Sequence, residues 1–225
     1  MGAAQPLNVS TRSGNVRVEA EPGVELSIEG GQVVREHDGA LEIRRNGSAS
    51  EIVVRCPTGS DITIGTASGD IATKGELGAV RVATVSGKVH VETASRVEVR
   101  AKSGSVDVDD CSGECRVVVT SGDVRVGQAH RAALAAVSGD IRADEVARAD
   151  VKTVSGDIHI GTTGAGKVSV HTVSGKVDVV VPSDVQPATR VRSISGRVQC
   201  DCPRGTDGEI AVASVSGAIR IACQK

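Results

Sequence analysis

The chain has 225 residues, no Phe, Trp or Tyr, a single Met, and a formal net charge of -2 from 26 basic and 28 acidic residues. This balance gives no basic surface, and the missing aromatic rings leave no platform for base stacking, so a nucleic-acid partner is not expected. The core must be filled by Val, Ile, Ala, Thr and Leu. Such residues suit sheets that face one another closely.

Residues 1–60 carry a blurred pattern of alternating aliphatic residues. Ser13-Gly14 lies between valines at alternate positions, which predicts one coil made of two short strands. The segment LSIEGGQVV at 26–34 predicts a further coil with glycine in place of serine. Residues 35–60 fit this alternating pattern worst, and we expect them to form an irregular or partly antiparallel stretch. We therefore expect residues 1–60 to form degenerate coils or a cap.

From residue 61 onward a Ser-Gly pair recurs nine times in the same frame, at steps of 17 to 21 residues. The pairs are Ser68-Gly69, Ser86-Gly87, Ser103-Gly104, Ser121-Gly122, Ser138-Gly139, Ser155-Gly156, Ser174-Gly175, Ser195-Gly196 and Ser216-Gly217. A period of this length is the signature of a solenoid, in which each repeat contacts only its neighbours. We expect residues 61–225 to form one continuous regular body.

Each Ser-Gly pair lies in the same frame of aliphatic residues. The fourth residue before the serine and the third after it are always large aliphatics, such as Val82 and Val89 around Ser86. This alternation predicts two short strands per coil with defined inward faces. Glycine allows a tight corner between them, and the serine, on the inward parity, is expected to hydrogen-bond to backbone there. The variation in length falls at the opposite connection, most of all at 180–190 and 201–209.

The predicted fold is an all-β parallel β-solenoid, a single-stranded β-helix of about 12 coils, each of 17 to 21 residues. Coils stacked ~4.8 Å apart would give a rod on the order of 55 Å long. We prefer right-handed winding because parallel β crossovers are generally right-handed.

Three related phrases recur in frame: AVSGDI at 136–141, TVSGDI at 153–158 and TVSGKV at 172–177. In these phrases the chain, over about residues 60–225, resembles the bacterial β-strand-repeat proteins known as putative adhesins of unknown function. The resemblance implies a β-solenoid and an adhesin-like role. It brings no catalytic residues that could be carried over.

A charged stripe is predicted on the outward face just after the corners. It contains Asp123, Asp140, Asp157, Arg125, Arg142 and His159. The three aspartates would stack within ~5 Å of one another, and the cationic residues would offset their repulsion as a mesh of salt bridges. The alternative is a site for a cation or a sugar. Catalysis by paired carboxylates is not expected, because aromatic sugar platforms are absent.

Six cysteines are irregularly spaced: Cys56, Cys111, Cys115, Cys200, Cys202 and Cys223. They are expected to be reduced and structural, and no metal or other cofactor is expected, because no cysteine pair has a second pair or a histidine at zinc spacing. Cys202 and Cys223 lie seven residues after their serines on successive coils, close enough for a disulfide by distance. Two residues that are paired in register on parallel strands seldom place their side chains in the geometry of a disulfide, so we expect no bridge.

The ends of the solenoid carry the functional prediction. The last coil, VASVSGAIRIACQK, keeps the repeat almost to Lys225, and neither end has an obvious cap. Uncapped strand edges favour association, so we expect a non-enzymatic structural scaffold that associates with itself end to end, as a dimer or a filament. The alternative is a monomeric, adhesin-like rod that recognises a protein or a glycan through its turn loops. A third, lyase-like β-helix enzyme has the least support.

No leader sequence and no run of 18 apolar residues is present in the chain as given. These absences predict a cytoplasmic protein without membrane insertion. A cell-surface location would follow if a leader had been removed.

Overall fold

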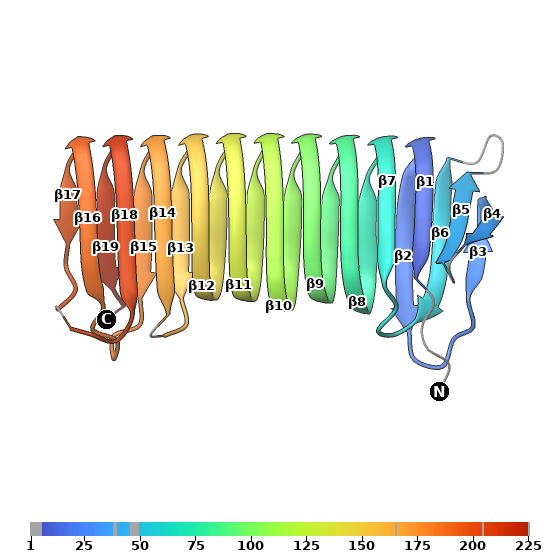
Figure 1. Cartoon of the computed structure of the whole chain (residues 1–225), viewed down its shortest axis with the longest axis horizontal. Coiled ribbons are helices and arrows are strands. Elements are labelled where there is room, and N and C mark those ends of the chain that lie inside the picture. Colours follow the sequence, from blue (N-terminus) through green and yellow to red (C-terminus); the bar gives the residue numbers. More distant parts are fainter. Residues whose placement is uncertain (1–5, 38–39, 46–49, 165, 204, 225) are drawn as a thin grey trace.

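The computed structural model describes residues 6–37, 40–45, 50–164, 166–203 and 205–224, and in this part every regular element is a β-strand. The strands stack side by side into a long rod (Figure 1). The described residues contain no helix with the length and apolar character needed to cross a membrane. The predicted all-β parallel solenoid is confirmed.

The strands fall into three groups along the chain. The N-terminal group is β1 (Leu7–Ser13), β2 (Asn15–Glu21), β3 (Ser27–Glu29), β4 (Gly31–His37), β5 (Ala40–Arg45), β6 (Glu51–Pro57) and β7 (Ile62–Ser68). The middle group is β8 (Ile71–Ser86), β9 (Val89–Ser103), β10 (Val106–Ser121), β11 (Val124–Ser138) and β12 (Ile141–Ser155). The C-terminal group is β13 (Ile158–Thr162), β14 (Lys167–Ser174), β15 (Val177–Val181), β16 (Ala188–Ser195), β17 (Val198–Cys200), β18 (Glu209–Ser216) and β19 (Ile219–Cys223).

The middle strands are longer than predicted. Each of β8 to β12 has 15 or 16 residues, because the chain stays paired while it bends at the connection opposite the Ser-Gly corner. Irregularities in register mark that bend, for example between Cys111 and Cys115. The serines of neighbouring coils stay in register, so that Ser138 lies between Ser121 and Ser155.

The core consists of the aliphatic residues that alternate along the strands. Val99, Val117 and Val151, each four residues before its serine, are 0% exposed. Val106, Val124 and Ile141, each three residues after a serine, are 1% exposed, as the inward faces predict. Small and β-branched side chains fill this space because the two walls of each coil lie close together.

The Ser-Gly corner depends on glycine for its shape. Gly139 has φ 128°, and a Cβ built there would overlap the carbonyl oxygen of Gly122 in the neighbouring coil. The serines do bond to backbone, since the Ser103 hydroxyl donates to the Val85 carbonyl oxygen at 3.2 Å. They are exposed or half-buried, however, so the predicted inward orientation is wrong. The strand ends at the serine, and its alternation does not extend through the corner.

At the C-terminal end the coils do not stack in chain order. β14 and β15 pair with β18 and β19, and these pair in turn with β16 and β17. The last coil of the chain therefore lies between two earlier ones, and β16 and β17 form the end of the rod (Figure 1).

The N-terminal end has a similar interleaving. β1 pairs with both β5 and β7, and β2 pairs with both β6 and β8, so the first coil lies between two later ones. β3 and β4 run antiparallel to β6 and β5. The prediction of a coil at 26–34 is therefore wrong. Alternating aliphatic residues fit an antiparallel pair of strands as well as they fit a parallel coil. The residues that the structure describes form about nine turns, not about 12.

Candidate functional site

The aspartates of the charged stripe bind backbone groups. Asp123 Oδ1 accepts the backbone N–H of Asp140 at 2.9 Å, and Asp140 Oδ1 accepts that of Asp157 at 2.8 Å. Asp157 Oδ1 in turn accepts the backbone N–H of Lys176 at 2.8 Å. Each carboxylate thus caps the corner of the next coil, a structural role that offsets the mutual repulsion of the stacked charges.

The cationic residues of the stripe pair elsewhere. Arg125 and Arg142 both contact Asp144, at 3.5 and 2.6 Å. His159 Nδ1 lies 3.7 Å from Asp178 Oδ2. The predicted mesh with Asp123, Asp140 and Asp157 is therefore wrong, because those carboxylates bond to backbone. The two arginine ion pairs are partly exposed and contribute little stability.

A cluster of potential metal ligands lies on the same face, one coil before this stripe. The ligand atoms of His90, Asp107 and Asp109 lie within 4.8 Å of one another. His90 Nε2 is 3.6 Å from Asp109 Oδ2, and both side chains are about half exposed. An exposed contact between His90 and Asp109 accounts for this arrangement, and we assign no metal to it.

Cys111 and Cys115 lie together in the core, where both are fully buried. The hydrogen bond from Cys115 lowers the pKa of Cys111 to about 7, while the same bond and burial raise the pKa of Cys115 well above its usual range. Because neither sulfur is exposed, the pair is a structural contact and not a reactive site.

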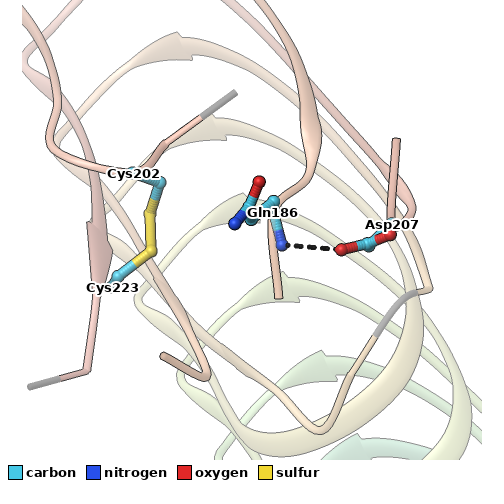
Figure 2. Close-up of a disulfide and its surroundings, with 4 residues drawn as sticks. All are labelled: Gln186, Cys202, Asp207 and Cys223. Carbon is cyan, nitrogen blue, oxygen red and sulfur yellow. Dashed lines mark hydrogen bonds between the residues drawn. A yellow bond between two sulfur atoms is a disulfide. The ribbon is translucent and has the colours of Figure 1, made fainter. Parts of the chain in front are cut away.

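Cys202 and Cys223 form a disulfide, with Cα atoms 5.3 Å apart (Figure 2). The prediction that all six cysteines are reduced is wrong. Cys202 lies beyond the end of β17 and outside the parallel ladder, so the constraint on in-register neighbours does not apply to it. The bridge joins the end of the outermost coil to the end of the coil beneath it.

Two long loops meet beside this disulfide. The backbone N–H of Gln186 donates to Asp207 Oδ2 at 3.2 Å (Figure 2), and the N–H of Asp207 donates to the Gln186 carbonyl oxygen at 2.9 Å. The backbone N–H of Gln224 bonds to the carbonyl oxygen of Val181 at 2.8 Å. The loops and the C-terminal segment are thus tied together at one corner of the rod.

The outermost coil leaves one end of the solenoid open. Within the described part of the chain, β16 pairs only with β18 and β17 only with β19. Val198 in β17 is 46% exposed, whereas Ile219, the equivalent residue one coil inward, is 1% exposed. The last coil of the sequence, which we expected to form this end, is covered. The open edge belongs to residues 188–200.

A row of exposed aliphatic side chains, which we did not predict from the sequence, lies along the C-terminal half of the rod. The residue just before the serine is outward and aliphatic in five successive coils of the C-terminal half. In spatial order these residues are Val137, Val154, Val173, Val215 and Ile194, with exposures of 49, 48, 46, 45 and 83%. The repeated Val-Ser-Gly phrases carry the signal for these residues, because an aliphatic residue precedes the serine in each phrase.

Three solved structures resemble this chain. A putative adhesin from Bacteroides fragilis has a TM-score of 0.56 and 16% identity, over 98% of this chain and 93% of the other. A putative lipid binding protein from Parabacteroides distasonis has a TM-score of 0.53 and 13% identity, over 99% and 94%. A putative cell adhesion protein from Clostridium sporogenes has 15% identity over 98% and 93%, but its TM-score of 0.26 supports no argument.

No curated protein matches the chain. The first two structural likenesses show a shared fold, and the resemblance inferred from the repeated TVSGDI and TVSGKV phrases is confirmed. The model of the Toastrack DUF4097 family matches residues 4–222, so the chain belongs to this family.

Proposed function

We propose that the protein is a non-enzymatic structural rod that associates with a second copy through the open end formed by β16 and β17. The observation that carries this proposal is the difference between equivalent residues of neighbouring coils. Val198 is 46% exposed, but Val177 and Ile219 are 0 and 1% exposed. An open strand edge beside exposed core residues favours pairing with another chain.

The difference between the two ends supports a closed dimer over a filament. Within the described residues the outermost strands of both ends have one partner each, but β16 and β17 continue the parallel coils, whereas β3 and β4 run antiparallel to β6 and β5. A two-fold contact uses the open end twice and closes after two copies. Head-to-tail growth would also need pairing with β3 and β4, which do not continue the parallel coils. Two copies of β16 would pair antiparallel, and each would satisfy the free backbone groups of the other.

The test is the absolute molar mass, measured by light scattering across a hundredfold range of concentration. The wild-type mass should rise from that of one 22.9 kDa chain toward that of two. Val198→Lys places a charge at the open end and should hold the mass at one chain. Val85→Lys, an exposed position on the outer face in the middle of the rod, is the matched control and should behave as the wild type.

A strictly monomeric wild type would refute this proposal. A mass that rises equally in the wild type and in Val198→Lys would place the contact elsewhere on the rod. A mass that grows beyond two chains would replace the closed dimer with a filament.

A second candidate is a monomeric binding rod that recognises a protein or a glycan through the loops at 182–187 and 201–208. The Cys202–Cys223 bridge and the bonds between Gln186 and Asp207 favour it, because loops held in one conformation lose less entropy on binding. The adhesin description of a structural neighbour supports the same role. Changing the exposed residues Asp184 and Gln186 to Ala should abolish binding on a glycan array or to a cell surface, without changing the molar mass.

The disulfide also bears on where the protein works. Disulfides persist mainly in oxidising compartments, so the Cys202–Cys223 bridge supports a site of action outside the cytoplasm. Counting thiols in the denatured protein, purified without reductant, tests this. Four reactive thiols would agree with the bridge, and six would contradict it.

A further inference from the structure

A shallow groove of about 550 Å³ runs along the outer face near the open end. It crosses β12, β14, β18 and β16, which are successive neighbours in the stack. Val173, Val215 and Ile194 line it, each from the position just before a serine, and they are 46, 45 and 83% exposed. The groove therefore offers a continuous apolar surface to a ligand that lies along the rod.

Two serine hydroxyls in the lining lack partners. In neighbouring coils this position holds threonine, and Thr153 Oγ1 and Thr172 Oγ1 donate to the carbonyl oxygens of Ser155 and Ser174 at 3.3 and 3.0 Å. Ser214 is only 6% exposed, and neither its hydroxyl nor that of Ser193 has a hydrogen-bond partner. A buried hydroxyl without a partner is destabilising, so this lining is less stable than that of the coils that carry threonine.

The charged groups at the groove are cationic. Lys152 and Arg192 line it, and a neighbouring hollow of about 220 Å³ shares Arg192 and adds Arg190. Among the described residues, no Asp or Glu lines either hollow.

Two of these cations already have partners, because Lys152 contacts Asp150 and Arg190 contacts Glu209, each at 3.5 Å. Arg192 has no ion pair within the described part of the chain. The combination of an apolar floor and an unpaired guanidinium fits a ligand with an apolar chain and an anionic head.

We propose that this groove binds a long-chain fatty acid, with the acyl chain over Val173, Val215 and Ile194 and the carboxylate at Arg192. The floor spans four coils, or ~14 Å from the first strand to the last, which suits an extended acyl chain. A second copy fits less well, since a two-fold contact through this face would bring Lys152 and Arg192 against like charges. This inference is independent of end-to-end association.

The test uses a polyene fatty acid whose fluorescence rises in an apolar site, because the chain has no Trp or Tyr to interfere. Hexadecanoate should displace the probe at a concentration at least tenfold lower than hexadecanol does, because only the acid has a charge for Arg192. The titrations are done with the wild type and repeated with Val198→Lys, so that association through the open end does not affect the result.

Variants at exposed positions locate the site with little risk to folding. Val173→Thr with Val215→Thr should weaken probe binding on the order of tenfold, and Arg192→Gln should weaken hexadecanoate but not hexadecanol. The matched controls are Val85→Thr and Arg100→Gln. These residues occupy the equivalent positions of the repeat in another hollow, of about 360 Å³. There Thr84 Oγ1 is satisfied by the Ser86 carbonyl oxygen. The controls should leave affinity unchanged.

Three results would overturn the proposal. Equal displacement by the acid and the alcohol would remove the role of Arg192. Equal loss of affinity in the groove variants and in the controls would show nonspecific adsorption. Absence of probe binding, together with a dimer that the groove variants convert to a monomer, would identify a second copy of the chain as the occupant.

Discussion

The coils in the middle of the rod and the coils at its two ends share one template but differ in their neighbours. From β8 to β12, each strand pairs with the next strand in the chain. At the ends, the first and last coils of the chain instead lie between two others. The Ser-Gly template thus sets the shape of a coil, and the connecting loops decide which coil it stacks on.

This interleaving places the last coil second from its end of the rod, and the first coil inside both β5 and β6 and the outermost β3 and β4. β18 has a strand on each side, as does β1, so neither terminal coil presents a free edge. Segments paired on both sides fray less than terminal strands usually do. The exposed edge at the C-terminal end falls instead on β16 and β17, which a disulfide ties to the coil beneath.

The largest expected effect concerns the corner that the middle and end coils share. Gly139→Ala should lower the free energy of unfolding by about 4 kcal/mol, because its φ is 128° and the added Cβ would overlap the Gly122 carbonyl. Gly65→Ala is the control, because a Cβ there meets nothing within 4 Å. Chemical denaturation of both variants measures the difference, and equal stability would contradict the role of the corner.

The next effect concerns the end coils alone. Loss of the Cys202–Cys223 bridge, which closes a span of 21 residues, should cost about 3 kcal/mol in the unfolding of the C-terminal coils. Cys223→Ser and limited proteolysis measure this, with cleavage expected first in the loops around 182–187 and 201–208. Cys200→Ser, which removes an exposed free thiol, should change nothing. If both variants resist proteolysis equally, the bridge does not hold the end coil.

A third comparison places the same substitution in a covered coil and in the open coil. Val177→Ala, at a residue 0% exposed, should cost about 2 kcal/mol. Val198→Ala, at the equivalent residue 46% exposed, should cost less than about 1 kcal/mol at low protein concentration. Thermal unfolding at several concentrations measures both. A cost at Val198 that grows with concentration would show that a second copy covers it.

The smallest effect concerns the aspartate ladder. Asp140→Ala removes the acceptor of the Asp157 backbone N–H and should cost about 1 kcal/mol. Asp150→Ala removes only the exposed contact with Lys152 at 3.5 Å and should be near neutral. Urea titration separates the two variants. A neutral Asp140→Ala would mean that the ladder does not stabilise the corner.

The sequence was sufficient to predict the coil, because period-two alternation and the glycine corner are local properties. It could not predict the order of the coils at the ends. Ser216 pairs in register with both Ser174 and Ser195, and the repeat makes all such registers equally good. The Cys202–Cys223 bridge was missed for the same reason, since it depends on where Cys202 leaves the ladder. Ser214 and Ser193 resemble the threonines at the same position, and only the three-dimensional contacts reveal their unpaired hydroxyls.

The most direct test of the central claim uses the native Cys200, which is exposed on the open coil and free. A two-fold dimer through β16 and β17 brings the two copies of Cys200 to the same interface, so mild oxidation or a short thiol cross-linker should give a covalent dimer. Cys200→Ser should abolish it, and Val198→Lys should strongly reduce it. A wild-type protein that stays monomeric after cross-linking, at concentrations where light scattering detects a dimer, would contradict association through this end.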